Sequence, residues 1–189
     1  MPNEKSCSTC LPLSHHKTEW LKSTIRDIPD FPKPGIVFKD LTTLLKDSEA
    51  FTFTLDALSE RFADARPHYI AAIEARGFIL GPAIARALGS GFVPIRKPGK
   101  LPYRVVKESY ALEYGEDVIE IHEDAVEKGK RVVLIDDLLA TGGTALAAYK
   151  LLDRIGADIV GIGFVVELSF LNGRAKLPAD IDVFSLVTY

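Results

Sequence analysis

The chain has 189 residues, of which 47% are hydrophobic and 26% are charged. This composition is typical of one globular domain with a substantial core and excludes a disordered chain. The formal net charge of −3 argues against a broadly basic, nucleic-acid-binding protein. No apolar run approaches the roughly 18 residues needed to span a bilayer, and the polar start resembles no signal peptide, so we expect a cytoplasmic protein.

The first 18 residues predict a polar, flexible extension, followed by a single domain over 19–189. The chain has two cysteines, too few for a disulfide framework. A zinc half-site is the alternative for this segment, because a C-x-x-C pair is followed by two histidines (Cys7, Cys10, His15 and His16). A lone half-site in a polar tail is weak evidence, and we favour the loose extension.

Periodicity and turn residues predict alternating helices and strands, without repeats, low-complexity segments or linkers. The predicted helices cover 19–28, 51–65, 77–88 and 145–155. The predicted strands cover 68–74, 91–95, 103–110, 117–122, 132–135, 159–168 and 181–186. The third and fourth of these strands form a hairpin that turns near residues 114–116. Alternation of this kind predicts an α/β fold with a mainly parallel central sheet flanked by helices.

The segment from Val132 to Thr144 carries the strongest chemical signal. Its four branched aliphatic residues, 132–135, are typical of a strand buried on both faces of a parallel sheet. Asp136 and Asp137 follow at the expected carboxyl end of that strand, where open α/β sheets bind ligands. Residues 141–144 (TGGT) then lead into a helix, and the backbone amides at a helix start can surround a phosphate.

This arrangement differs from the common nucleotide-binding loops. A Walker loop needs a lysine beside its last glycine, and the dinucleotide fingerprint needs G-x-G-x-x-G; neither pattern is present in this segment. Two acids before a small phosphate loop suit a sugar phosphate, because carboxylates bind hydroxyls and amides bind phosphate. The alternative is a polar turn and a helix capped by Thr141 or Thr144; the full thirteen-residue string favours the ligand site.

Two basic segments are candidates for binding an anion. Arg76 and Gly77 directly follow a predicted strand, where a guanidinium and open backbone amides can bind an anion together. Residues 96–107 contain five cations and no acid between the first and the last of them: Arg96, Lys97, Lys100, Arg104 and Lys107. This run predicts a lid, covering about residues 96–122, that closes over a polyanion and excludes water. Ordinary surface charge is the alternative for both segments.

Residues 31–40 suggest a binding site for a flat ring. Prolines around a glycine predict a stiff, extended segment whose backbone groups stay available to a ligand. Phe38 offers a face on which a base can stack, an interaction worth roughly 1–3 kcal/mol in nucleic-acid complexes. Packing of Phe38 into the core is the alternative.

The four hydrophobic residues, two acids and TGGT together resemble the signature of the type I phosphoribosyltransferases, which bind 5-phosphoribosyl-1-pyrophosphate. Residues 138–140 (Leu-Leu-Ala), which lie between the two acids and TGGT, resemble those of the adenine phosphoribosyltransferase branch of that family. The resemblance runs from about Phe31 to Lys176, and its motifs occur in the expected order. It implies the type I phosphoribosyltransferase fold, with a small N-terminal hood over about 29–40.

The resemblance assigns each part of the phosphoribosyl donor to a motif. Asp136 and Asp137 would hold the ribose hydroxyls and favour the positive charge that grows on the sugar. The 5-phosphate would be anchored by the loop formed by Ala140, Thr141, Gly142, Gly143 and Thr144. The pyrophosphate would be bound by Arg76 and by the lid residues Arg96, Lys97 and Lys100.

The resemblance also assigns the base site. Backbone atoms at Val37 would pair with the edge of adenine, and Phe38 would stack on the ring. At the next position, where the family often has arginine, this chain has Lys39, which keeps a donor but loses the planar fork. Glu113 would act near N7 of the purine as a catalytic residue together with the aspartate pair, and Tyr114 would help cover the site.

The implied reaction joins adenine to the phosphoribosyl group, giving AMP and pyrophosphate, in purine salvage. Mg²⁺ would be bound mainly through the substrate and water, without direct protein ligands, and the family usually forms homodimers. Two alternatives stay open: a 6-oxopurine acceptor (hypoxanthine, guanine or xanthine), and a transcription regulator that senses phosphoribosyl pyrophosphate without catalysis. Neither nucleic acid nor membrane is an expected partner of the enzyme.

Overall fold

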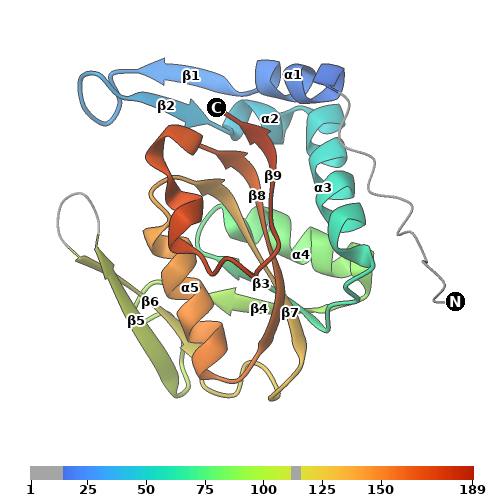
Figure 1. The fold of residues 1–189 in the computed structure, drawn as a ribbon, viewed down its shortest axis with the longest axis vertical. Helices are drawn as coiled ribbons and strands as arrows, with labels where there is room; N and C mark the ends of the chain where they lie inside the picture. Colours follow the sequence, from blue (N-terminus) through green and yellow to red (C-terminus); the bar gives the residue numbers. More distant parts are fainter. Residues whose placement is uncertain (1–14, 112–115) are drawn as a thin grey trace, which may run out of the picture. The chain divides into compact units, whose positions relative to one another are not determined.

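The computed structural model describes residues 15–111 and 116–189 (Figure 1). The predictions for Cys7, Cys10, Glu113 and Tyr114 therefore lie outside the described residues. Contacts between Cα atoms divide the chain into two compact units, Met1–Phe53 and Thr54–Tyr189. Among the helices in the described part of the chain, none is both long and apolar enough to cross a membrane.

The described part of the first unit contains two helices, a two-stranded antiparallel sheet and the start of a third helix. Its elements are α1 (His15–Thr24), β1 (Arg26–Pro29), β2 (Val37–Asp40), α2 (Thr42–Lys46) and the beginning of α3 (Ser48–Ala63). Helix α1 starts inside the segment predicted to be an extension. Helix α3 starts three residues earlier than predicted, because the Asp47 carboxylate accepts hydrogen bonds from the backbone amides of Glu49 and Ala50.

The prediction of a helix over 19–28 is wrong at its end. Helix α1 stops at Thr24, whose hydroxyl donates to the backbone carbonyl of Leu21 at 2.8 Å. The next residues are extended and pair with β2, with Arg26 opposite Asp40. The Arg26 guanidinium and the Asp40 carboxylate also form an ion pair at 2.5 Å. Local periodicity could not predict this strand, because its partner lies about ten residues further along the chain.

The second unit contains the predicted parallel sheet. Its five strands, in the spatial order β4-β3-β7-β8-β9, are all parallel. They cover Tyr69–Ile73 (β3), Gly91–Ile95 (β4), Arg131–Leu139 (β7), Asp158–Glu167 (β8) and Val183–Thr188 (β9). The remaining elements are α4 (Gly77–Leu88), β5 (Val105–Ala111), β6 (Glu116–His122), α5 (Gly143–Arg154), and the short 3-10 helices η1 (Ser169–Leu171) and η2 (Gly173–Lys176).

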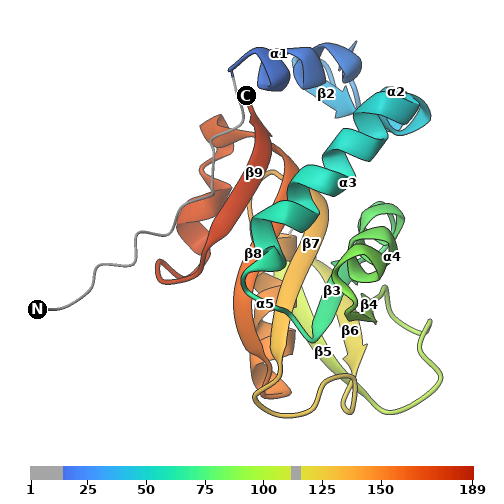
Figure 2. The same cartoon turned by 90° about the vertical axis from the view of Figure 1, so that its right-hand side faces the viewer.

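The order of the strands creates a switch point between β3 and β7. Strand β3 connects through α4 to β4 on one side, whereas β7 connects through α5 to β8 on the other side. Because such crossovers are right-handed, the two helices cover opposite faces of the sheet, as Figures 1 and 2 show. Open α/β sheets bind their ligands at the carboxyl ends of the strands beside such a point.

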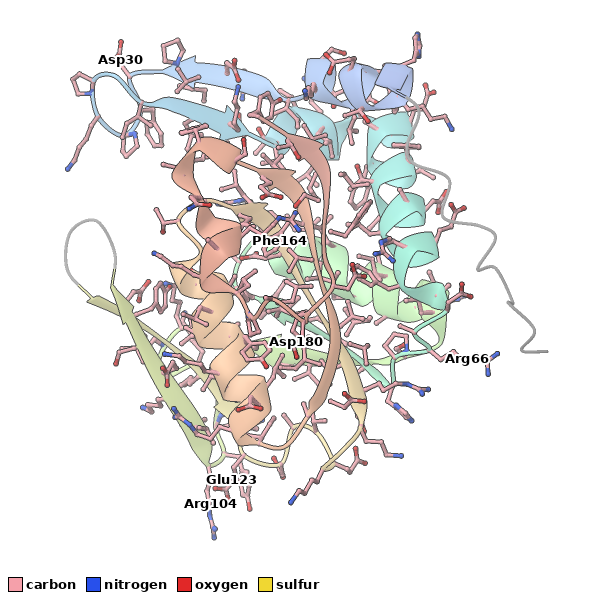
Figure 3. All side chains as sticks on the ribbon, in the orientation of Figure 1. Asp30, Arg66, Arg104, Glu123, Phe164 and Asp180 are labelled. Atoms are coloured by element: carbon pink, nitrogen blue, oxygen red, sulfur yellow. The ribbon has the colours of Figure 1, made fainter. Side chains whose placement is uncertain are left out.

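The core lies between this sheet and its helices. Residues Val132 to Ile135 of β7 are fully buried, as their uninterrupted hydrophobic pattern predicts. Figure 3 shows Phe164 of β8 inside the unit, with Arg66, Arg104 and Glu123 on its outside. The sheet therefore gives a rigid base to the loops at its carboxyl edge.

Strands β5 and β6 form the predicted antiparallel hairpin, which is attached to the sheet unit. Glu108 of β5 pairs with Lys150 at 3.2 Å and with Arg154 at 2.5 Å, both on α5. Arg154 also donates to the backbone carbonyl of Lys107 at 2.8 Å. The base of the predicted lid is thus fastened to α5 in this structure.

Candidate active site

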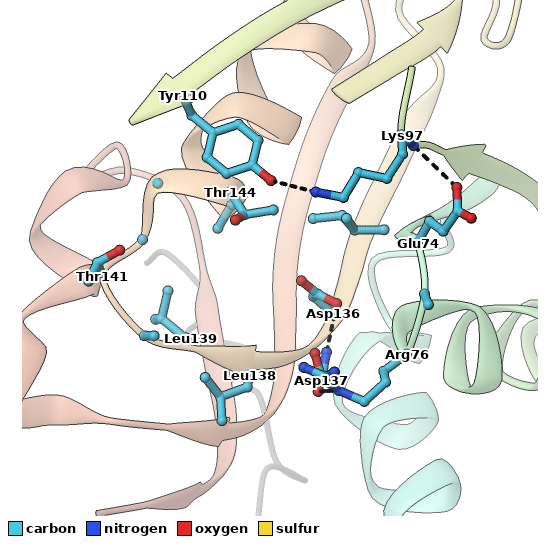
Figure 4. A pocket seen from close by; sticks show the side chains of 16 residues that line it. Glu74, Arg76, Lys97, Tyr110, Asp136, Asp137, Leu138, Leu139, Thr141 and Thr144 are labelled. Carbon is cyan, nitrogen blue, oxygen red and sulfur yellow. Dashed lines mark hydrogen bonds and ion pairs between the residues drawn. The ribbon is translucent and has the colours of Figure 1, made fainter. Parts of the chain in front are cut away.

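A cavity of about 270 Å³ lies at the carboxyl ends of β3 and β7, at the switch point (Figure 4). It brings together three segments that are distant in sequence: the β3–α4 turn, the end of β7 with the start of α5, and two residues from the predicted lid. Its walls are formed by Ile73, Glu74, Ala75, Arg76, Lys97, Tyr110, Asp136, Asp137, Leu138, Leu139, Ala140, Thr141, Gly142, Gly143, Thr144 and Ala145.

The predicted phosphate loop forms one wall of the cavity. Gly142, with φ +79°, is the residue that precedes the first turn of α5, and no side-chain hydrogen bond caps this helix within the described structure. A threonine cap, the alternative considered for Thr141 and Thr144, is therefore not observed. The start of α5 keeps its backbone amides directed toward the loop, the arrangement that favours a bound phosphate.

Asp136 and Asp137 lie inside β7 and not after it, because the strand continues to Leu139. They still reach the cavity, because β3 ends earlier: the last registered pair between the two strands joins Ala72 and Ile135. Beyond that pair, the edge of β7 that faces β3 borders the cavity. The sequence therefore predicted correctly that both acids face the ligand cavity, but it placed the end of the strand too early.

The two carboxylates have different surroundings. Burial, and next the neighbouring charge of Asp137, raise the pKa of the Asp136 carboxyl well above its usual range. The Asp136 Oδ1 atom accepts a hydrogen bond from the backbone amide of Asp137 at 2.9 Å. The Asp137 side chain is almost fully buried and forms an ion pair with the Arg76 guanidinium.

Arg76 has a position that suits an anion ligand. It precedes the first turn of α4, directly after β3, and its side chain is 49% exposed. Gly77 opens the helix close to the acids: a Cβ atom there would lie 3.1 Å from Asp136 Oδ1. The predicted pyrophosphate ligand and the predicted ribose ligand Asp137 are therefore direct neighbours.

Four of the five cations in residues 96–107 form ion pairs with acids from outside that run. Lys97 forms an ion pair with Asp117 of β6, and its ammonium group lies 3.3 Å from the Tyr110 hydroxyl. Burial alone would lower the pKa of Lys97, but the hydrogen bonds with Asp117 and Tyr110 outweigh it and raise that pKa. Lys97 is the only cation of the predicted lid that lines the cavity in the described structure.

The other lid cations lie outside the cavity wall. Arg96 donates from Nε to Glu74 Oε2 at 3.1 Å, and Lys107 pairs with the buried Glu120 at 3.3 Å. Lys100 is exposed, and its backbone carbonyl accepts a hydrogen bond from Arg96 at 3.3 Å. In the described chain the basic run is therefore largely neutralised, and only part of it faces the cavity.

The predicted base-binding residues belong to the first unit. Val37 is 48% exposed and Phe38 is partly buried, with its ring edge-on to Phe31 at a centroid distance of 5.2 Å. The Lys39 ammonium pairs with the Asp27 carboxylate at 2.6 Å. Phe38 is thus not fully buried, and the exposed apolar side chains near it are Val37 at the start of β2 and Phe31 and Ile36 in the connection between the two strands.

Sequence reasoning assigned no role to three residues in or beside the cavity. Glu74 accepts hydrogen bonds from Arg96 and from the backbone amide of Lys97, so it holds the start of the lid beside β3. Tyr110 and Asp117 enclose the Lys97 ammonium group. No local pattern identifies them, because each acts on a residue that the fold brings close.

The site can be compared with known proteins. Residues 43–187 match the family described as "Phosphoribosyl transferase domain". A relative from Acidobacterium capsulatum, named adenine phosphoribosyltransferase, is 57% identical over 171 residues, which are 90% of this chain and 94% of the relative.

Solved structures agree with the sequence comparison. The adenine phosphoribosyltransferase of Thermoanaerobacter pseudethanolicus has a TM-score of 0.87 and 50% identity, over 91% of this chain and 99% of that one. The Saccharomyces cerevisiae enzyme, complexed with adenine and an imino-altritol 1,6-bisphosphate, has a TM-score of 0.85 and 40% identity, over 90% and 98%. This chain belongs to the phosphoribosyltransferase family and, within it, to the adenine phosphoribosyltransferases.

Proposed function

We infer that the chain transfers the 5-phosphoribosyl group from phosphoribosyl pyrophosphate to adenine, giving AMP and pyrophosphate. One observation carries this inference: a single cavity combines two acids, a phosphate loop at a helix start, and an arginine and a lysine. A sugar that carries a phosphate at one end and a pyrophosphate at the other matches this order of groups. The 1,6-bisphosphate bound by the yeast relative also has two anionic ends.

In this proposal the phosphoribosyl donor spans the cavity. Residues 140–144 bind the 5-phosphate through backbone amides and the two threonine hydroxyls. Asp136 and Asp137 bind the ribose hydroxyls. Arg76 and Lys97 bind the pyrophosphate, with Arg96 and Lys100 joining them when the lid residues reach the substrate.

Transfer of a ribosyl group passes through an oxocarbenium-like transition state, as glycoside hydrolysis does. Catalysis then depends on placement and charge stabilisation and needs no covalent nucleophile. The carboxylates beside the sugar stabilise the positive charge that develops on it. Arg76 and Lys97 stabilise the negative charge that develops on the departing pyrophosphate.

The raised pKa of Asp136 gives this residue a specific part in the proposal. A protonated carboxyl both donates and accepts hydrogen bonds, so Asp136 can bind a ribose hydroxyl in either direction. The Asp137 carboxylate, which is paired with Arg76, supplies the negative charge beside the sugar.

We propose that the adenine ring is bound by backbone atoms at Val37, by stacking on Phe38 and by the donor of Lys39. Glu113 is proposed to assist proton transfer near N7, and Tyr114 to cover the base. The exposed apolar surface at Phe31 and Val37 supports a role for this segment in binding a flat ring. The ion pair of Lys39 with Asp27 favours a positioning role for the lysine over direct base contact.

Magnesium fits the donors of the cavity, because hard carboxylate oxygens and phosphate oxygens are its preferred ligands. We propose that the ion would be held mainly by substrate oxygens and water beside Asp136 and Asp137, without direct protein ligands. When bound there, Mg²⁺ supplies positive charge to the leaving pyrophosphate. A homodimer and a cytoplasmic location stay predictions from the family resemblance.

The decisive experiment measures AMP formation from radiolabelled adenine, phosphoribosyl pyrophosphate and Mg²⁺, with hypoxanthine, guanine and xanthine in parallel. Selective conversion of adenine is expected. Conversion of an oxopurine instead would contradict the base assignment but leave the donor site intact. Binding of the donor without turnover of any base, together with sequence-specific DNA binding, would favour the regulator.

A further inference from the structure

The phosphate loop rests on a backbone contact that comes from another part of the chain. If Gly142 carried a Cβ atom, it would lie 2.3 Å from the carbonyl oxygen of Gly173. A Cβ atom at Gly173 would lie 2.1 Å from the carbonyl oxygen of Ala140 and 2.8 Å from the amide nitrogen of Gly142. The backbones of the loop and of residue 173 therefore touch directly, and neither position has room for a side chain.

Gly173 is held in place by its neighbour Arg174. The Arg174 guanidinium donates from Nε to Glu167 Oε1 at 3.0 Å, and its Nη2 group donates to the second oxygen of the same carboxylate. Its Nη1 group donates to the backbone carbonyl of Val183 at 2.5 Å. A forked, two-point ion pair of this kind fixes both the position and the angle of the guanidinium.

Glu167 ends strand β8 and is itself well anchored. Its side chain is only 9% exposed, and the Ser185 hydroxyl donates to it at 2.8 Å. The hydrogen bond from Arg174 comes first among the causes that lower the pKa of Glu167, so its carboxylate stays ionised. Glu167 is also in register with Leu139, the last residue of β7 before the phosphate loop.

These contacts make a continuous path from the sheet to the phosphate loop. Strand β8 holds Glu167, Glu167 holds Arg174, and the residue before Arg174 touches the loop at Ala140 and Gly142. A second link runs in parallel, because the amide of Leu168 donates to the carbonyl of Leu139 at 2.9 Å. The loop is thus braced against β8 and β9 as well as by its own strand and helix.

We propose that Arg174 and Glu167 are positioning residues for the 5-phosphate of the phosphoribosyl ligand. They do not line the cavity; they act through Gly173, whose backbone sets the path of residues 140–142. A shift of the loop would misalign the amides that surround the phosphate, and misplacements near 1 Å cost binding groups much of their effect. This inference rests on the proposed function, because it presumes that the loop binds a sugar phosphate.

The alternative is that the pair only stabilises the fold. A fold-stabilising pair would affect every ligand alike, whereas a loop-positioning pair affects ligands that carry a 5-phosphate. Pyrophosphate provides the comparison, because Arg76 and Lys97 are proposed to bind it at the opposite end of the cavity. Ribose 5-phosphate is the second ligand of the comparison, because it carries the 5-phosphate and no pyrophosphate.

The test measures the Kd of ribose 5-phosphate, AMP and pyrophosphate by calorimetry for the wild-type protein and for Arg174→Met, which keeps the bulk of the side chain. The expected result is that the Kd of ribose 5-phosphate and of AMP rises about tenfold, by loop misplacement, while that of pyrophosphate is unchanged. In kinetics, KM for phosphoribosyl pyrophosphate rises and KM for adenine does not. Arg174→Lys restores part of the affinity, since a lysine still pairs with Glu167.

Arg131→Met is the matched control. Arg131 begins β7, at the end of the strand away from the phosphate loop, and donates to the backbone carbonyl of Arg66 at 3.1 and 2.9 Å. Its loss should lower the melting temperature without a selective effect on ribose 5-phosphate. If Arg174→Met fails to fold, Glu167→Gln, which keeps a hydrogen bond but loses the charge, provides the same comparison at a smaller expected effect.

Two results would overturn the inference: unchanged affinity for ribose 5-phosphate in folded Arg174→Met or Glu167→Gln, or equal losses for pyrophosphate and ribose 5-phosphate. Failure of the proposed function gives a different result, because the wild-type protein would then bind neither ribose 5-phosphate nor AMP. The two failures are therefore distinguishable.

Discussion

Arg76 and Asp137 form an ion pair in the wall of the cavity, which joins the start of α4 to the last third of β7. The carboxylate is almost fully buried, whereas the guanidinium is half exposed. The pair joins the residue proposed to bind pyrophosphate to one proposed to bind the ribose. Each therefore holds the other in position before the donor binds.

Asp137→Asn should reduce turnover much more than stability. The variant loses the negative charge that stabilises the developing oxocarbenium, and we expect kcat to fall by about a hundredfold or more, the usual range for a lost electrostatic group. Its melting temperature should change little, because the Arg76 guanidinium that loses its partner remains half in water. Kinetics and thermal unfolding of the same preparation provide the measurement. Asp182→Asn, which breaks the Arg61–Asp182 pair, is the control and should keep normal turnover.

Asp136 should make the folded protein less stable as the pH rises. The pKa of its carboxyl is raised in the folded state, so the folded protein keeps this proton at pH values where the unfolded chain, with a pKa near 3.8, has released it. The contribution to the unfolding free energy is therefore present at low pH and is lost as pH rises toward the folded-state pKa. Denaturant unfolding at pH 5 and pH 8 measures it.

In the Asp136→Asn variant that part of the pH dependence should disappear. The amide carbonyl still accepts the hydrogen bond from the Asp137 backbone amide, and no charge is buried. We expect the variant to lose less unfolding free energy than the wild-type protein between pH 5 and pH 8, with turnover greatly reduced. An unchanged pH dependence in the variant would show that another group is responsible.

Gly142→Ala separates backbone strain from close contact. Gly142 and Gly129 have nearly the same φ, +79° and +77°, but a Cβ atom at Gly129 meets nothing within 4 Å. Gly129→Ala should therefore cost only the strain of the left-handed region, about 1–2 kcal/mol. Gly142→Ala should cost clearly more and should also weaken binding of ribose 5-phosphate. Equal losses of unfolding free energy in the two variants would contradict the close contact with Gly173.

Lys97 and Asp117 should affect pyrophosphate in opposite directions. Lys97→Gln removes a cation from the cavity wall, so we expect the Kd of pyrophosphate to rise and that of ribose 5-phosphate to stay constant. Asp117→Asn removes the carboxylate that competes for the Lys97 ammonium group, so pyrophosphate should bind more tightly, most of all at low salt. Calorimetry at two salt concentrations measures both. Weaker binding in Asp117→Asn would mean that Asp117 orients the lysine and does not compete for it.

Much of this protein follows from local sequence. The hydrophobic run of residues 132–135 predicts a strand buried on both faces, and the TGGT segment predicts the start of a helix; the structure confirms this strand and this helix. Helix α4 and strand β4 have the predicted bounds. These features depend on periods of two or 3.6 residues and on glycines beside helix starts, which are properties of neighbouring residues.

Tertiary structure decided which groups meet. The pairing of Arg76 with Asp137, of Lys97 with Asp117 and of Gly142 with Gly173 joins residues 61, 20 and 31 positions apart. The basic run alone predicted a free positive lid, but the fold supplies the acids that neutralise it. Strand β1 was missed because its extended conformation depends on pairing with β2, which lies outside the residues whose periodicity was read. Such contacts depend on strand order and on crossovers that place distant segments at one edge of the sheet, and no local period encodes them.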